Sequence, residues 1–531
     1  MQKVRLIIIA LLILLPLCTS AQGRRVLHYD CLKGAPLSSP EGDTTPRIQA
    51  NEAPSGAVGG AWGAAAPRRP LTLQTQWDAE RTYPILVILV EFADKAFSCE
   101  DPVDRYNRML NEEGYNEGVG PGCLTEYFVE QSGGFFHPRF DVFGPIAISA
   151  NCSGNGQYGT SAFRSALLQA GELEGIDFSE YDWNGDGRGE YVVFVHAGYG
   201  GNETETQGKG YIWPSTGNFS SLTLGGITFT GYSGSAELWS NDTSCGIGTI
   251  AHEFSHTLGL PDIYPTSGSE YSVCDEWDLM DGGNYANDGW CPPCYTAHER
   301  MLLGWLTPVE LAESITINNL KPLADDGVAY IINTESANEF FLLENRQWSG
   351  WDARTPGHGL LISHVDYNAS AWQNNRVNTN RTHHRYELVH ADNRDYNAWD
   401  SIVGKGSTHL GGHSLLLSGT AYPFVNDSTE NRDFTDFSEP AATTFSGTGL
   451  LSKPITDIEE DADGSISFHF MGGDTNGIDD IEQLSQQDDR CYDLHGRRVS
   501  ASYRGLVIKN GKLFNSHYII NKHNPSYESY Y

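Results

Sequence analysis

The chain has few positive charges for its size. It carries 34 Lys and Arg against 68 Asp and Glu, which gives a formal net charge of -34 over 531 residues. A surface of this kind repels nucleic acid and anionic lipid, so we set nucleic-acid binding aside. The acidic balance suits a protein that stays soluble outside the cell and binds calcium through carboxylates, although solubility alone explains it equally well.

Long apolar runs are also scarce. The one candidate membrane segment is residues 6–17, and its about 12 residues fall short of the roughly 20 that cross a bilayer. Lys3 and Arg5 precede this run and small residues up to Ala21 follow it, which is the pattern of a secretory signal peptide. We predict cleavage after Ala21 and a mature chain without a transmembrane segment. An uncleaved anchor and a lipoprotein at Cys18 are the weaker alternatives.

Paired metal-binding cysteine motifs are missing as well. Cys291 and Cys294 form a CPPC motif, but the chain has no second CxxC and no thioredoxin-like pattern beside the first. A redox or structural-zinc role is therefore disfavoured. Of the ten cysteines, removal of the signal peptide takes Cys18 away and leaves nine. In an exported protein these are disulfide candidates of undefined pairing.

What the chain does have is enough length for two or three domains. Residues 22–78 are rich in Gly, Ala, Pro and Ser and are predicted to be the pro-segment of a zymogen or a linker. The aliphatic run at 83–92 is typical of a strand buried on both faces, and we expect it at the centre of a mixed sheet. Further patterns predict helices at 102–113, 124–131 and 161–174, and strands at 140–148 and 190–196.

The second half changes character. An active-site helix is predicted at 247–258 with Gly259 at its C-cap, and another helix at 295–305. Beyond residue 307 the pattern becomes short alternating runs of a β-rich, sandwich-like region. We predict an α+β fold without internal repeats. Its parts would be a zincin- or metzincin-like catalytic domain at 79–308, the β-rich domain at 309–471, and a linker with a small β unit at 472–531.

The segment HEFSHTLGLPD carries the chemistry. His252 and His256 stand four residues apart, so on a helix both imidazoles project from one face and can bind one metal ion. Glu253 lies beside them, where its carboxylate can take a proton from a metal-bound water. Zinc lowers the pKa of that water toward about 7, and Glu253 would then pass the proton to the leaving amine.

The residues after the pair make the pattern more specific. Gly259 and Asp262 follow His256 at the spacing at which metzincin peptidases carry their third metal ligand, with Asp262 in place of the usual His. A carboxylate oxygen is an acceptable zinc ligand and leaves an open fourth position. We favour Asp262 over Glu276, which stands downstream where a gluzincin-type ligand would. An ordinary helix with two histidines is the alternative for the pair.

Three other residues are candidates near this site. Met280 in the segment DLMDGG stands where a methionine turn would underlie the metal, or it fills the core. Tyr264 and Tyr285 are each close enough in sequence to stabilise the oxyanion of a tetrahedral intermediate.

Asp182, Asn184, Asp186 and Glu190 have the alternating oxygen ligands of a calcium loop, with a turn glycine at position 187. The twelfth position is Val193, so the loop lacks the bidentate Glu of an EF-hand, and a strand follows in place of a helix. Calcium binding and a plain Asx/Gly-rich turn both remain open.

Several ordered motifs resemble the M6 peptidases of the immune-inhibitor-A type. They are ILVILVEFAD, YDWNGDGRGEYVVFVHAGYG, GIGTIAHEFSHTLGLPDIY, WDLMDGG, ERMLLGWLTP, FLLENRQWSGWD and GHGLLISHVDY, over about residues 80 to 400. The resemblance implies a secreted zinc endopeptidase with a pro-segment, a zincin-like catalytic domain and a β-rich region behind it. It also implies that His252, His256 and Asp262 bind the metal and that Glu253 is the general base.

The tail carries a second resemblance. CYDLHGRRVS from Cys491 and GLVIKNGK from Gly505 are similar to the C-terminal sorting domains of the type IX secretion system. This implies export across a bacterial outer membrane, a partner in the secretion machinery, and a secreted or cell-surface location. An ordinary β-rich accessory module is the alternative.

The sequence thus predicts a zinc metalloendopeptidase of HExxHxxGxxD type that acts on protein or peptide substrates, with one catalytic Zn²⁺ and a candidate Ca²⁺ site. Two other functions stay open, an inactive peptidase-like binding or adhesion protein and a metallohydrolase of non-peptide substrates.

Overall fold

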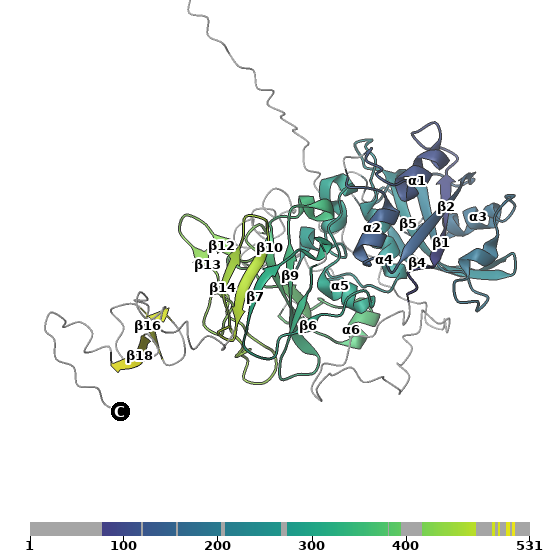
Figure 1. Ribbon diagram of the computed structural model, residues 1–531. Helices are drawn as coiled ribbons and strands as arrows, with labels where there is room; N and C mark the ends of the chain where they lie inside the picture. The colour runs from purple at the N-terminus through teal and green to yellow at the C-terminus, as the bar shows by residue number, and fades with distance from the viewer. Residues whose placement is uncertain are drawn as a thin grey trace, which may run out of the picture.

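The computed structural model describes residues 77–473, apart from 118–119, 156–157, 203–205, 207, 267–272, 326, 381 and 395–416, and four strands between residues 491 and 515 (Figure 1). The predicted signal peptide, nearly all of the predicted pro-segment and most of the linker after residue 471 lie outside the described residues.

The first sheet has five strands in the order β2-β1-β3-β5-β4. Their bounds are Thr82–Glu91 for β1, His137–Ala147 for β2, Val192–Tyr199 for β3, Ser215–Leu224 for β4 and Ile227–Leu238 for β5. β1 pairs in parallel with both β2 and β3, whereas β4 runs antiparallel to β5, so the sheet is mixed. β1 is an interior strand as expected, but the central position belongs to β3. The prediction of β1 as the central strand was wrong because neither β4 nor β5 was predicted from the sequence, and both lie beyond β3.

That hairpin joins β4 and β5 through two glycines. Gly225 and Gly226 have φ angles of +56° and +89°, and Leu224 pairs directly with Ile227 across the turn. Positive φ at both central residues is the type I′ geometry that closes two-residue hairpins, and glycine adopts it without a steric penalty. The Gly-Gly pair between alternating runs was the available sequence signal.

Helices cover both faces of this sheet. They are α1 (Pro102–Asn111), α2 (Leu124–Gln131) and α4 (Gly248–Thr257) on one face and α3 (Thr160–Ala170) on the other. Two further helices, α5 (Ala297–Leu302) and α6 (Ala369–Gln373), follow later in the chain, and α5 contacts β9 (Glu339–Arg346). Alternate side chains of β1 explain the layers: Ile85 and Val87 enter a core shared with α1, α2 and α4, whereas Leu86 and Ile88 enter a core shared with α3. α5 is shorter than the predicted helix because Thr296 forms a capping box and starts it at residue 297.

Short 3-10 helices complete the loops at Phe178–Tyr181 (η2), Asp275–Trp277 (η3), Gly283–Gly289 (η4), Leu323–Asp325 (η5) and Gly350–Arg354 (η6). None of the helices among the described residues is long and apolar enough to cross a membrane.

The β-rich region contains a five-stranded sheet of order β11-β10-β9-β8-β6 and a three-stranded sheet of order β14-β15-β7. The first has β6 (Val309–Glu310), β8 (Tyr330–Asn333), β9 (Glu339–Arg346), β10 (Gly359–Asp366) and β11 (Tyr386–Leu388). The second has β7 (Ile315–Leu320), β14 (Ile455–Glu460) and β15 (Ile466–Phe470), and β12 (Phe424–Val425) pairs with β13 (Glu430–Asn431). In Figure 1 these sheets lie beside the first sheet, with α5 between them.

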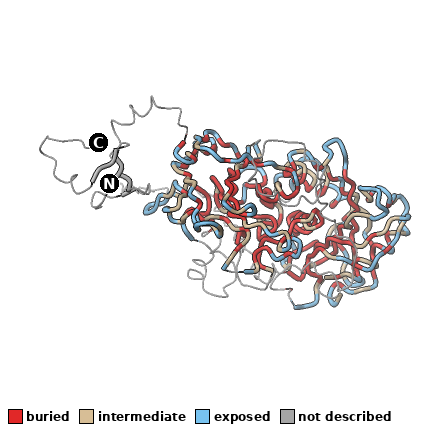
Figure 2. The backbone as a smooth tube through the Cα atoms, turned by 90° about the horizontal axis from the view of Figure 1, so that it is seen from below, coloured by how far each residue is buried: buried red, intermediate tan, exposed pale blue. Residues whose placement is uncertain are grey.

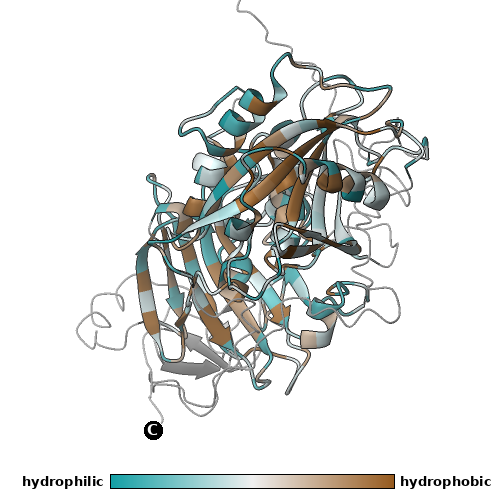
Figure 3. Ribbon diagram, turned by 90° about the vertical axis from the view of Figure 1, so that its right-hand side faces the viewer, coloured by the Kyte–Doolittle hydropathy of each residue, from teal (hydrophilic) through white to brown (hydrophobic). Residues whose placement is uncertain are grey.

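The five-stranded sheet of the β-rich region is buried on both faces. Leu342 and Leu361 enter the core that contains α4, whereas Phe341 and Ile362 enter a core shared with β7, β14 and β15. This explains why β9 and β10 are continuous apolar runs rather than strictly alternating ones. Figure 2 shows the buried backbone running through both parts, and Figure 3 shows hydrophobic residues along the strands of both sheets.

The tail holds four short strands in a sheet of order β17-β16-β18-β19. They are β16 (Cys491–Asp493), β17 (Arg498–Val499), β18 (Leu506–Lys509) and β19 (Lys512–Asn515). The predicted small β unit is therefore present, and its role in sorting stays a prediction.

Six buried or half-buried cysteines between residues 99 and 294 form no disulfide, contrary to the expectation. They are Cys99, Cys123, Cys152, Cys274, Cys291 and Cys294. The CPPC thiols lie in packed surroundings, where Cys291 Sγ donates to the carbonyl of Trp351 at 3.3 Å. Burial raises the pKa of Cys291 to about 12, so this thiol is unreactive.

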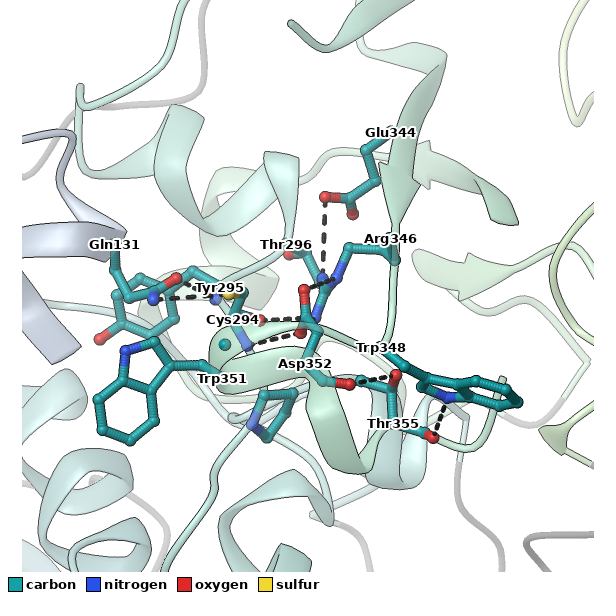
Figure 4. A network of polar contacts seen from close by, with 12 residues as sticks. Gln131, Cys294, Tyr295, Thr296, Glu344, Arg346, Trp348, Trp351, Asp352 and Thr355 are labelled. Carbon is teal, nitrogen blue, oxygen red and sulfur yellow. Dashed lines mark hydrogen bonds and ion pairs between the residues drawn. The ribbon is translucent and has the colours of Figure 1, made fainter. Parts of the chain in front are cut away.

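A buried ion network joins β9 to the segment before α5 (Figure 4). Arg346, 1% exposed, donates through Nε and a terminal nitrogen to the two carboxylate oxygens of Asp352 at 2.8 and 2.5 Å. The same terminal nitrogen donates to the carbonyl of Cys294 at 3.0 Å, and Cys294 N donates to Asp352 at 2.9 Å. Glu344 lies 3.8 Å from Arg346 and accepts from Ala297 N at 3.1 Å. This network fixes the β-rich region against the helical layer.

The variant Arg346→Ala tests how much this network contributes to the stability of the fold. We expect the free energy of unfolding to fall by about 3–5 kcal/mol, because removing one partner of a buried pair leaves uncompensated charges on Asp352 and Glu344. Urea unfolding followed by tryptophan fluorescence measures it. The control is Arg108→Ala, which breaks a 3.0 Å pair to Asp104 with side chains 45% and 60% exposed and should cost about 0.5 kcal/mol or less. Equal losses for the two variants would contradict the prediction.

Candidate metal centre

Helix α4 presents the two histidines to one point. The rings of His252 and His256 are 4.9 Å apart between centroids, with planes at 87°. His252 Nδ1 lies 2.8 Å from the carbonyl oxygen of Leu279, and His256 Nδ1 lies 2.8 Å from that of Leu260. A carbonyl only accepts, so each Nδ1 carries the proton and each Nε2 keeps its lone pair for a ligand.

Asp262 meets both imidazoles. The chain leaves α4 at Leu258 and turns at Gly259, whose φ of +102° favours glycine. This turn brings Asp262 Oδ1 to 3.2 Å from Nε2 of both His252 and His256. Asp262 is 1% exposed, and its Oδ1 has no hydrogen-bond partner. A buried carboxylate oxygen without a donor is costly unless a cation neutralises it.

These three side chains fit a metal ion by chemistry and by position. Their ligand atoms all lie within 4.8 Å of one another, and they form the one such group of His, Cys, Asp or Glu in the part of the chain that the structure describes. Burial alone would raise the pKa of Asp262, but His256 and His252 hold it below its usual range. The pKa of His256 is raised to about 9, with Asp262 outweighing burial. A divalent cation would replace the positive charge that Asp262 otherwise favours on His256.

Glu253 lies next to this group on α4 and is held by the edge strand β4. Thr216 Oγ1 is 2.6 Å from the Glu253 carbonyl oxygen and 3.1 Å from its Oε2, so its one hydroxyl proton is divided between these two acceptors. Glu253 is 6% exposed, and burial raises its pKa, although His252 and His256 oppose this. The carboxyl group is therefore held in place, and burial makes it keep its proton to a higher pH than an exposed carboxyl group would.

The backbone around Met280 contacts both α4 and the loop that carries Asp262. The Leu279 carbonyl accepts from His252, and the Met280 carbonyl accepts from Ile263 N at 2.8 Å, directly after Asp262. Met280 N donates to Asp278 Oδ1 at 2.7 Å, and the Met280 side chain is fully buried. The backbone at this position thus ties the ligand helix to the ligand loop, and a role for the sulfur stays a prediction.

The structure does not bring the other candidates into this group. Glu276 lies on η3 and is not part of the described cluster, which contains Asp262 instead. The Tyr285 hydroxyl accepts from Asn202 at 3.3 Å, and its ring packs at 5.8 Å from Trp239. Tyr264 is buried in the core that contains α4. Oxyanion stabilisation by either tyrosine stays a prediction.

The candidate calcium loop is shaped by its own hydrogen bonds. The Asp182 carboxylate accepts from the backbone N–H groups of residues 185, 186 and 187 at 2.8, 3.1 and 2.8 Å. Asn184 Oδ1 accepts from Asp186 N at 2.9 Å. Burial, with the nearby charges of Asp186 and Asp182, raises the pKa of Glu190 to about 7. Calcium binding here stays a prediction.

Sequence reasoning missed four groups that hold the site. They are the Thr216 hydroxyl, the Leu260 and Leu279 carbonyls, and the Asn375 amide, which contacts Asp262 from 113 residues further along the chain. The carbonyls carry no side-chain signal, and the Thr216 contact depends on the β4–β5 hairpin. Nothing local marks Asn375 among the other asparagines.

The mixed sheet and the His-His-Asp group together define an arrangement of the metallopeptidase type. Residues 73–292 match the family model of the immune inhibitor A peptidase M6 catalytic domain. This stretch contains β1 to β5, α1 to α4, the His-His-Asp group and Glu253, and it is less than half of the 531 residues. The match confirms the resemblance to M6 peptidases for this stretch and does not extend to the motifs after residue 292.

Two kinds of relative are similar to part of this chain. Immune inhibitor A of Bacillus thuringiensis subsp. alesti is 26% identical over 286 residues, which cover 44% of this chain and 41% of that protein. Pre-pro-metalloprotease PrtV from two strains of Vibrio cholerae serotype O1 is 24% identical over 261 residues, covering 39% of this chain and 28% of PrtV. The matched part thus spans less than half the length of each of these relatives.

Asp262→Ala and Glu276→Ala decide the third ligand. We expect Asp262→Ala to lose stoichiometric zinc, because two imidazoles remain without the carboxylate that faces them, and Glu276→Ala to retain it. Mass-spectrometric metal analysis after dialysis measures the zinc content. Retention by the first variant and loss by the second would assign the ligand to Glu276.

Proposed function

We propose that this protein is a secreted zinc-dependent endopeptidase that hydrolyses peptide bonds of extracellular proteins. One observation carries the proposal: His252 Nε2 and His256 Nε2 both lie 3.2 Å from one oxygen of Asp262, beside the buried Glu253. In this proposal the three clustered side chains hold one zinc ion. The similarity of residues 73–292 to M6 peptidases supports it.

Zinc and the residues around it would have separate roles in the reaction. Bound zinc would polarise the substrate carbonyl and lower the pKa of a water toward about 7. Glu253 takes a proton from the attacking water and passes it to the leaving amine. Thr216 fixes Oε2 of that carboxylate through a 3.1 Å hydrogen bond, so the general base keeps one orientation. The Leu260 and Leu279 carbonyls hold the two imidazoles in the tautomer that binds a cation.

The position of strand β4 favours a peptide as the substrate. It is an edge strand, and among the described strands it pairs only with β5. An extended peptide binds to such an edge through main-chain hydrogen bonds. Because Thr216 on β4 contacts Glu253, a peptide aligned along this edge would pass the general base. This favours a peptide over the non-peptide substrates of other metallohydrolases, and the intact Glu253 argues against an inactive binding protein.

The remaining features of the proposal concern export and processing. Residues 1–21 would direct secretion, residues 22–78 would be removed from a zymogen, and the tail sheet would engage a bacterial type IX secretion machinery. The protein would then act outside the cell or at its surface. Calcium at the Asp182 loop would stabilise the segment between η2 and β3.

Glu253→Gln tests the function directly. We expect casein hydrolysis by the processed protein to fall about 10²- to 10⁴-fold, which is the usual contribution of a general base, while zinc stays bound. Fluorescent casein cleavage and metal analysis are measured together, and a zinc chelator should abolish the wild-type activity. Zinc binding without proteolysis in any processed form would favour the binding protein or the non-peptide hydrolase.

Thr216→Val tests the orientation of the general base. Valine has nearly the same shape, so the change removes the hydroxyl that donates to Glu253, a bond to a charged group worth about 1.5–3 kcal/mol. We expect kcat to fall at least about tenfold, with KM and zinc content nearly unchanged. Thr223→Val on the same strand is the control, because Thr223 is exposed and its hydroxyl contacts that of Thr228 at 3.0 Å, away from Glu253. Equal kcat for both variants would refute the role of Thr216.

A further inference from the structure

We propose that Asn375 is a positioning residue of the metal centre, so that a segment of the β-rich region completes a site otherwise formed by residues 248–262. This inference rests on the proposed metal-binding role of His252, His256 and Asp262. Asn375 lies beyond residue 292, where the M6 match ends, and beyond the predicted end of the catalytic domain at residue 308. It touches a ligand and not the metal.

Asn375 holds Asp262 through two reciprocal hydrogen bonds. Its Nδ2 donates to Asp262 Oδ2 at 2.6 Å, and its Oδ1 accepts from Asp262 N at 2.7 Å. The two bonds link the carboxylate to its own backbone and so fix its rotation. Oδ2 is thereby engaged, and Oδ1 is left as the oxygen that faces the two imidazoles. Asn375 therefore selects which carboxylate oxygen a cation meets.

Only a side-chain amide has the required chemistry in this space. It carries a donor and an acceptor side by side on a short stem, whereas a carboxylate would place a second acceptor against Oδ2. Asn375 is 1% exposed and has a φ of +54°, a conformation that asparagine tolerates better than most residues. A neutral amide also leaves the negative charge of Asp262 intact for the cation.

The segment around Asn375 is itself fastened to the ligand loop. Thr266 Oγ1 donates to the Asn375 carbonyl at 2.5 Å, and Asn378 Nδ2 donates to the Ile263 carbonyl at 2.8 Å. Asn378 Nδ2 also lies 2.8 Å from the carbonyl of Tyr386 on β11. Val377 is buried in the core that contains α4. The loop that carries Asp262 is thus held from the β-rich region at several points, of which Asn375 alone contacts the carboxylate.

Asn375→Gly is the decisive variant, because glycine accepts the positive φ and the change removes only the amide. We expect the full chain to bind zinc about 10- to 100-fold more weakly, the usual effect of losing a partner that orients a metal ligand. Competition with a chromophoric chelator measures the zinc affinity. The visible spectrum of the cobalt-substituted protein should also change, because the carboxylate ligand is no longer fixed.

Two neighbouring asparagines provide matched controls. Asn374→Ala, at an exposed residue that bonds only within α6, should leave zinc affinity unchanged. Asn378→Ala loosens the same segment without touching the Asp262 carboxylate and should have a smaller effect than Asn375→Gly. If Asn378→Ala weakens zinc as much, Asn375 has only a general structural role and the proposal fails.

Asn375→Ala keeps the inference testable if the glycine variant does not fold. Alanine fits the space and retains the Cβ atom but makes neither hydrogen bond, so folded protein with weakened zinc binding supports the proposal. Wild-type zinc affinity in a folded variant of either kind overturns it and leaves the proposed function standing. Failure of the wild-type chain to bind zinc would instead overturn both.

Discussion

The candidate site depends on one oxygen atom of Asp262. This oxygen lies 3.2 Å from the Nε2 atoms of both His252 and His256, is shielded from solvent and accepts no hydrogen bond. Everything around it serves to keep the three groups together: two backbone carbonyls orient the imidazoles, Gly259 turns the chain, and the Asn375 amide occupies the other carboxylate oxygen. The side chains of such a group lose their conformational freedom during folding, so little further entropy is lost when a ligand binds.

The second constraint is the sheet β11-β10-β9-β8-β6, which belongs to two cores at once. Because alternate side chains of β9 and β10 enter opposite cores, the β-rich region cannot separate from the helical layer without exposing a large apolar surface. The hydrogen bonds that join Cys294, in the segment before α5, to Arg346 and Asp352 add direction to this contact, since they require one relative orientation. The position of Asn375 against Asp262 is a consequence of that fixed contact.

The periodicity of apolar residues was sufficient to predict the helices and strands that depend only on residues close together in the sequence. The helix with His252 and His256, the buried strand β1, and helix α2 follow from local patterns, and the spacing from His256 to Asp262 indicated the third member of the group. The hairpin of β4 and β5 was missed although Gly225 and Gly226 mark its turn. Thr216 and Asn375 could not be predicted, because each reaches the site only through tertiary packing of a distant segment.

The chemistry of the group also explains why its supports are neutral. The two imidazoles donate to backbone carbonyls, and the Asp262 carboxylate accepts a hydrogen bond from the Asn375 amide. Asp262 and Glu253 are therefore the only carboxylates among the two histidines, Asp262, Glu253 and the described groups that hydrogen-bond to them. Carboxylates in those supporting positions would add repulsion between buried anions whenever no cation is bound. With neutral supports, the negative charge of Asp262 faces the two imidazoles and raises the pKa of His256. A cation that takes the place of the imidazolium proton meets a preformed, desolvated anion, and its binding adds directly to the stability of the folded chain.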